Sequence, residues 1–151
     1  MSYLQKRIEV EVENIRSDAS RAVQSKDFSE GKQGALEALN ALRKTILPLN
    51  AAPLLTLINE QEKTLMKDLE KKHLDDCRED FTRRRNTSDR RDVAECRKRL
   101  DAFLELWPDS AERKNVEEVR DFLNVIQGGV KGKLNIVKGK INKEKIGRAH
   151  V

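Results

Sequence analysis

Few side chains in this 151-residue chain have types and spacing suited to chemistry. His73 and Cys77 stand four residues apart, which places two potential metal ligands on one face of a helix, and Cys96 could join them from the next helix. A closed zinc site usually needs four protein ligands, and the only other histidine is His150. We therefore predict no metal and interpret both cysteines as reduced, buried thiols that pack as small hydrophobic groups.

A catalytic constellation is equally hard to assemble. Nothing marks a nucleophile beside His73, so no triad can be proposed. The four carboxylates within residues 75–80, Asp80 among them, alternate with lysine and arginine as on a solvated helix face. The segment EGKQG (30–34) lacks the spacing of a phosphate-binding P-loop. We predict no catalytic residue, no cofactor and no enzymatic activity within this chain.

A cluster of arginines raises the alternative of nucleic-acid binding, because clustered positive charge is typical of proteins that contact phosphates. The residues that would make these contacts are Arg83, Arg84, Arg85, Arg90 and Arg91, in a basic cluster that extends to Arg99. Acidic residues are interleaved throughout, however, with 31 basic against 26 acidic side chains. Only 4% of residues are aromatic, which leaves few rings for base stacking. A solvated charged face is the favoured interpretation.

Five helices are expected to position these residues, because apolar side chains recur at three- and four-residue steps in five segments. The first two stripes follow residues 4–22 and 36–46, and Pro48 should close the second helix. A long third helix should open at Pro53 and fade in RRRNTSD (83–89). The fourth stripe runs over residues 93–107 and the fifth over 116–126, ending at Gly128-Gly129.

The end of the fourth helix carries the chain's only tryptophan, Trp107, beside Phe103 and Leu104. These three residues form either a partner interface or a helix junction, and we favour Trp107 as a plug packed between the fourth and fifth helices. Asp109 and Glu112 have the spacing of a capping box that would start the fifth helix.

The fold class that follows is all-α, with about five helices as antiparallel hairpins in an α-solenoid-like or spectrin-like bundle. Two proline-bearing junctions, LPLNAA (47–52) and LWPDSA (106–111), lie 59 positions apart. The segments SKDFSEGKQGALEAL (25–39) and FLELWPDSAE (103–112) resemble parts of tetratricopeptide helical hairpins. The family repeats every 34 residues, and the long third helix is a second departure, so only stacked hairpins are implied.

Three regions are expected along the chain. Residues 1–128 form the helical-hairpin region, and residues 129–145, with the near-repeat VKGKLNI/VKGKINK, form a basic linker or the start of a further element. Residues 146–151, IGRAHV, resemble one reading frame of a common short-read sequencing adapter that continues into a stop codon. We therefore predict a non-native tail on a fragment of a longer protein.

The function predicted from these observations is that of a non-catalytic protein-interaction or scaffold segment with one or more protein partners. One alternative is a nucleic-acid-binding helical module, and another is a helical arm of a large multidomain enzyme whose catalytic domain lies elsewhere. No apolar run approaches the length of a membrane span, and no signal-like block opens the chain. We expect a soluble, cytoplasmic protein.

Overall fold

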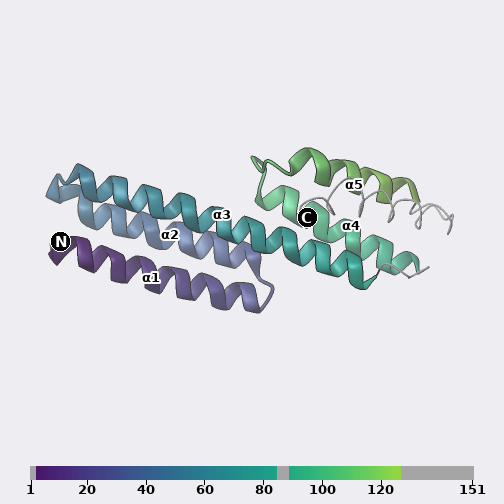
Figure 1. Cartoon of the computed structure of the whole chain (residues 1–151), viewed down its shortest axis with the longest axis horizontal. Coiled ribbons are helices and arrows are strands. Elements are labelled where there is room, and N and C mark those ends of the chain that lie inside the picture. Colours follow the sequence, from purple (N-terminus) through teal and green to yellow (C-terminus); the bar gives the residue numbers. More distant parts are fainter. Residues whose placement is uncertain (1–2, 85–88, 127–151) are drawn as a thin grey trace. The chain divides into compact units, whose positions relative to one another are not determined.

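The computed structural model describes residues 3–84 and 89–126, with side chains described as far as residue 123. The helices are α1 (Tyr3–Gln24), α2 (Phe28–Ile46), α3 (Ala52–Arg83), α4 (Arg90–Leu106) and α5 (Arg113–Ile126), with a short 3-10 helix, η1 (Leu47–Leu49), after α2 (Figure 1). No strand occurs within the described ranges, so the predicted all-α fold is confirmed. The Gly128-Gly129 stop, the basic segment 129–145 and the tail 146–151 lie outside the described residues.

The chain divides into two units between His73 and Leu74, a boundary that falls inside α3. Unit 1 contains α1, α2 and the first part of α3, which lie side by side in alternating directions (Figure 1). Its core consists of most of the apolar positions expected from the sequence, together with Phe28 and Ala35, whereas Leu4 at the start of the first stripe is exposed. The buried apolar residues of unit 1 are Ile8, Val12, Ile15, Ala19, Phe28, Ala35, Leu39, Ile46, Ile58, Leu65 and Leu69.

Both turns of unit 1 use residues with a left-handed backbone. Between α1 and α2, Lys26 has φ 62°, and Asp27 then caps α2 by accepting a 3.1 Å hydrogen bond from the amide of Glu30. Between α2 and α3, η1 contains Pro48 and is followed by Asn50, which has φ 52°. Asparagine tolerates this conformation better than most residues, so the chain reverses here without glycine.

Unit 2 contains α3 from Leu74 onward, α4 and α5. Its buried apolar residues are Leu74, Cys77, Phe81, Val93, Cys96, Leu100, Phe103, Leu104, Trp107, Val116, Val119 and Leu123. Asp89 caps α4 by accepting a 2.8 Å hydrogen bond from the amide of Arg91. The predicted cap of the fifth helix is wrong: the hydroxyl of Ser110, not Asp109, accepts a 3.1 Å hydrogen bond from the amide of Glu112. The turn after Trp107 places Ser110 closer to the helix start.

Candidate functional site

A buried carboxylate, Asp80, lies at the centre of the predicted basic cluster. Its side chain is only 2% exposed, although the sequence pattern placed it on a solvated face. That part of the prediction is wrong, and Arg78 is also buried. The reason is helical spacing: Cys77, Asp80 and Arg84 follow one another at steps of three and four residues along α3. They therefore share the face of α3 that α4 covers.

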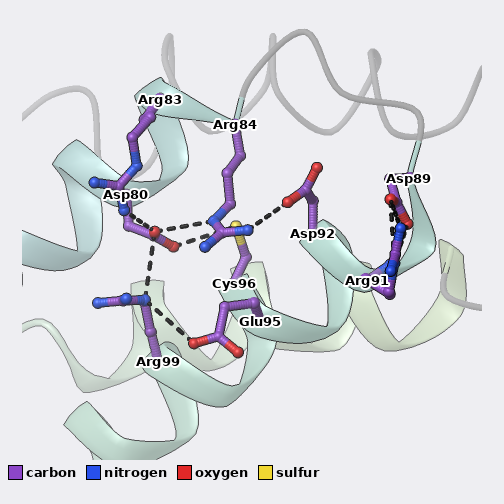
Figure 2. Close-up of polar contacts among 9 residues, drawn as sticks. All are labelled: Asp80, Arg83, Arg84, Asp89, Arg91, Asp92, Glu95, Cys96 and Arg99. Atoms are coloured by element: carbon purple, nitrogen blue, oxygen red, sulfur yellow. Dashed lines mark hydrogen bonds and ion pairs between the residues drawn. The ribbon is translucent and has the colours of Figure 1, made fainter.

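Three guanidinium groups converge on the Asp80 carboxylate (Figure 2). Arg83 Nη2 donates to Asp80 Oδ1 at 2.5 Å, and Arg84 Nε donates to the same oxygen at 2.9 Å. From α4, Arg99 Nε lies 3.3 Å from Oδ1 as an ion pair. We call Asp80, Arg83, Arg84 and Arg99 the Asp80 cluster. Because its members come from both helices, the cluster ties α3 to α4.

Further carboxylates offset the positive charge of this cluster. Arg84 also pairs with Asp92, and the guanidinium group of Arg99 lies 3.7 Å from the Glu95 carboxylate (Figure 2). Arg99 also lies 3.3 Å from the Asp76 carboxylate. Arg84 and Arg99, the two half-buried arginines of the cluster, therefore each form an ion pair with at least one acid besides Asp80. This balance disfavours phosphate binding, because a phosphate would have to displace carboxylates that already occupy the donors.

The electrostatics of Asp80 fit a structural ion-pair site. Burial alone would raise its pKa, but hydrogen bonds from Arg84 and Arg83 and the charge of Arg99 outweigh burial and lower it. Asp80 therefore stays ionised at neutral pH. The same interaction with Asp80 raises the pKa of Arg84. Neither group is poised to exchange a proton near pH 7, so general acid–base catalysis does not follow from this arrangement.

Two protonated thiols border the Asp80 cluster. The Cys96 thiol donates to Asp80 Oδ2 at 3.6 Å, and the Cys77 thiol donates to the backbone carbonyl of Arg99 at 3.7 Å. Burial, reinforced by nearby acids, raises the pKa of each thiol to about 12. Since the thiolate is the reactive and metal-binding form, these cysteines are chemically quiet at neutral pH.

The internal histidine, His73, packs against an aromatic ring. His73 is buried in unit 1, where its ring stacks on Phe28 with centroids 4.2 Å apart and planes 5° from parallel. Among the described side chains, no group of three His, Cys, Asp or Glu residues could hold a metal ion. His150 lies outside the described residues.

The predicted phosphate-contacting arginines differ in their surroundings, and whether they bind phosphate stays a prediction. Arg83 and Arg84 are held by Asp80, whereas Arg91 lies 3.0 Å from Asp89 and is exposed. Arg90 is exposed at the start of α4, and Arg85 lies outside the described residues. Arg99 and Arg84 both pair with Asp80, whereas the sequence had indicated only that both belong to a basic cluster.

Phe103, Leu104 and Trp107 are all buried in unit 2. Trp107 is 6% exposed, its amide donates to the carbonyl of Phe103 at 2.9 Å, and its own carbonyl accepts from the amide of Ser110. The side chain thus lies at the α4–α5 turn, among core residues of both helices. This burial favours the junction plug over an exposed anchor.

A groove between α1 and α2 of unit 1 is a feature that the sequence did not indicate. Two hollows, of about 210 and 420 Å³, share Ile15 and Ala38 in their linings and together form the α1–α2 groove. The groove is lined on the α2 side by small residues, which recur along the helix at steps of three and four. The small α2 residues along the groove are Gly31, Gly34, Ala35, Ala38 and Ala41. Their spacing was the signal available in the sequence.

Comparison with known proteins gives no relative. The chain matches no family model, no curated protein and no solved structure. The tetratricopeptide resemblance therefore stays a prediction. None of the described helices is long and apolar enough to span a lipid bilayer.

Proposed function

We propose that the chain is a non-catalytic protein-interaction segment that binds an α-helix of a partner in the α1–α2 groove. The observation that carries the proposal is the groove itself, with an apolar floor and polar ends. Helix-in-groove docking is a common mode of peptide recognition, in which apolar side chains at helical spacing fill a trough between two helices.

The floor of the groove suits close helix packing. Ile15 and Ala35 are buried at its base, while Ala22 and Ala38 are half-buried along its length. A Cβ added at Gly34 would have only the Glu30 carboxylate, 3.8 Å away, as a neighbour. The groove therefore has room at Gly34 for a side chain from another molecule.

The charges at the ends of the groove define the occupant further. Glu30 and Asp18 line one end, although Asp18 already pairs with Arg21 at the surface, and Arg7 and Glu11 line the other end. A matching partner helix carries a stripe of apolar residues, with a basic residue near Glu30. The other predicted functions, nucleic-acid binding and an arm of a larger enzyme, remain predictions.

A photo-crosslinking residue in place of Gly34 in the full chain tests the proposal. Captured proteins are identified, and the helical segment that carries the crosslink is synthesised and titrated against the chain by calorimetry. The substitution Ala38→Leu fills the groove, and we expect it to weaken binding about tenfold or more, because interface cores carry most of the affinity.

Gln33→Leu is the matched control, since Gln33 is exposed on α2 and does not line either hollow. Both variants add a leucine to the same helix, and leucine is a good helix former, so circular dichroism should show intact folding. Equal affinity of Ala38→Leu and the unmodified chain for the captured helix would show that the groove is not the binding site.

A further inference from the structure

One end of unit 1 is formed by three chain segments: the start of α1, the η1 turn, and the start of α3 (Figure 1). Arg7 lines a hollow together with Thr45, and Ile8 lines another with Leu57, so the three segments lie close together. We call this region, residues 3–8 and 43–57, the η1 end. Arg7 and Thr45 also line one end of the α1–α2 groove, so the η1 end borders the groove; it differs from the groove in its exposed large apolar side chains.

The η1 end exposes large apolar side chains. Tyr3 is 74% exposed, and Leu47 and Leu49 on either side of Pro48 are 65% and 50% exposed. Leu4 adds to the same surface. Exposed large apolar side chains that occur at one end of a domain mark interaction sites on otherwise polar proteins.

The charge of the η1 end is positive. Residues 3–8 and 38–59 contain no aspartate or glutamate, but they contain Lys6, Arg7, Arg43 and Lys44. Arg43 pairs with Glu62 at 3.0 Å, whereas Lys6, Arg7 and Lys44 are exposed and form no ion pair among the described residues. The nearest acids along α1 are Glu9 and Glu11.

Helix geometry adds to this positive charge. Both α1 and α3 begin at the η1 end, and neither has an acidic residue in its first turn. Their free amide groups therefore add partial positive charge beside the basic side chains. Exposed leucines, an exposed tyrosine and cations without an ion pair among the described residues thus occur together at one end of unit 1, although Glu11 lines the same hollow as Arg7.

We propose that the η1 end docks on the surface of an anionic lipid bilayer. Leu47 and Leu49 enter the region between head groups and acyl chains, and Tyr3 lies at the interface, where amphipathic rings are favoured. Lys6, Arg7 and Lys44 contact the lipid phosphates. A bilayer deforms around protruding side chains, whereas a folded protein partner would need a preformed pocket for each of them.

Sedimentation of the full chain with vesicles tests the proposal. We expect binding to phosphatidylcholine vesicles that contain phosphatidylserine, little binding to pure phosphatidylcholine, and weakening as salt is raised, because salt screens exposed charges. The double variant Leu47→Ser/Leu49→Ser should bind at least about tenfold more weakly than the unmodified chain, because the insertion of apolar surface is lost. Lys6→Gln/Lys44→Gln should lose about fivefold for each charge.

Two control variants make the same change of charge elsewhere. Lys98→Gln/Lys114→Gln alters exposed positions of unit 2, and Lys138→Gln/Lys140→Gln alters the basic segment 129–145. We expect both to bind as the unmodified chain does. Circular dichroism of each variant checks that folding is intact, and all substituted lysines and leucines of units 1 and 2 are exposed.

The proposal is overturned if the unmodified chain shows no phosphatidylserine-dependent binding. It is also overturned if the η1-end variants bind normally while Lys138→Gln/Lys140→Gln does not, since the basic segment would then be the lipid-binding element. Loss of binding to an acidic amphipathic peptide in the leucine variant, with vesicle binding unchanged, would instead assign the η1 end to a protein partner.

Discussion

At the scale of single residues, Asp80 is the buried carboxylate shared by three arginines of unit 2. Replacing it with asparagine would leave Arg83, Arg84 and Arg99 without their shared carboxylate. Breaking a buried ion pair typically costs 3–5 kcal/mol, and we expect about 3 kcal/mol for Asp80→Asn, because these guanidinium groups are partly hydrated. Urea unfolding followed by circular dichroism measures the loss.

The matched control is Asp92→Asn, which removes one half-buried acid from Arg84 and leaves Asp80 in place. Its cost should be at most about 1 kcal/mol, as for other partly exposed ion pairs. Equal losses for the two variants would mean that Asp80 is not the centre of the network.

The same carboxylate makes stability depend on acid pH. The pKa of Asp80 is lowered on folding, so its contribution is complete above the unfolded pKa of about 3.9 and is lost as pH falls through the lower folded value. Asp80→Asn should therefore flatten the dependence of the unfolding free energy on pH in this acid range. An unchanged slope would contradict the assignment.

Trp107 offers a second prediction at this scale. Trp107→Ala should lower the free energy of unfolding by about 3–5 kcal/mol, because a large buried side chain leaves a cavity between α4 and α5. Because Trp107 is the only tryptophan, the intrinsic tryptophan fluorescence of the chain comes from this residue alone, and it should be blue-shifted in the folded chain. Red-shifted emission with an unaltered melt would instead identify Trp107 as an exposed anchor.

Trp107 and Asp80 show which side-chain environments can be predicted from the sequence and which cannot. Trp107 lies on a plain apolar stripe, so its burial could be anticipated from spacing alone. Asp80 lies on the same kind of stripe, but a charged residue at a core position is indistinguishable from a solvated one until its partners are known. Those partners include Arg99 on another helix, and no local pattern gives that pairing.

At the scale of helices, the stripes predicted the number of elements and most of their buried faces, because periodicity reflects the whole length of a helix. Helix ends were less certain, since a cap depends on the local path of the turn. Asp109 had suitable chemistry, yet the turn that begins at Trp107 brings Ser110 into the capping position instead. The α1–α2 groove was missed because small residues also occur in ordinary helix contacts.

The cap itself can be tested by a pair of substitutions. Ser110→Ala removes the hydroxyl that accepts the amide of Glu112, and we expect a loss of about 1 kcal/mol in unfolding free energy. Asp109→Ala, at the neighbouring exposed position, should cost a few tenths of a kcal/mol at most. A larger loss for Asp109→Ala than for Ser110→Ala, measured by thermal melts, would restore the capping box predicted from the sequence.

At the scale of the whole chain, the notable feature is that α3 contributes to two cores. Ile58, Leu65 and Leu69 are buried in unit 1, whereas Leu74, Cys77 and Phe81 are buried in unit 2. Because one uninterrupted helix carries both sets, unfolding of either unit removes the support of half of α3. We therefore expect the two units to unfold in one cooperative transition.

A proline at Lys72 tests this coupling. Lys72 is exposed one residue before His73, where the boundary falls, and its side chain forms only a surface pair with Asp68 at 3.1 Å. Proline in a helix interior removes a backbone hydrogen bond and clashes with the preceding turn, at a cost of about 3 kcal/mol or more. Lys72→Pro should lower overall stability and split the urea transition into two steps.

Lys72→Ala, which removes the same ion pair without breaking the helix, should keep a single transition. Hydrogen exchange would show amides of α1 and α4 opening with one common free energy in Lys72→Ala and with two in Lys72→Pro; two free energies in both variants would mean that α3 does not couple the units.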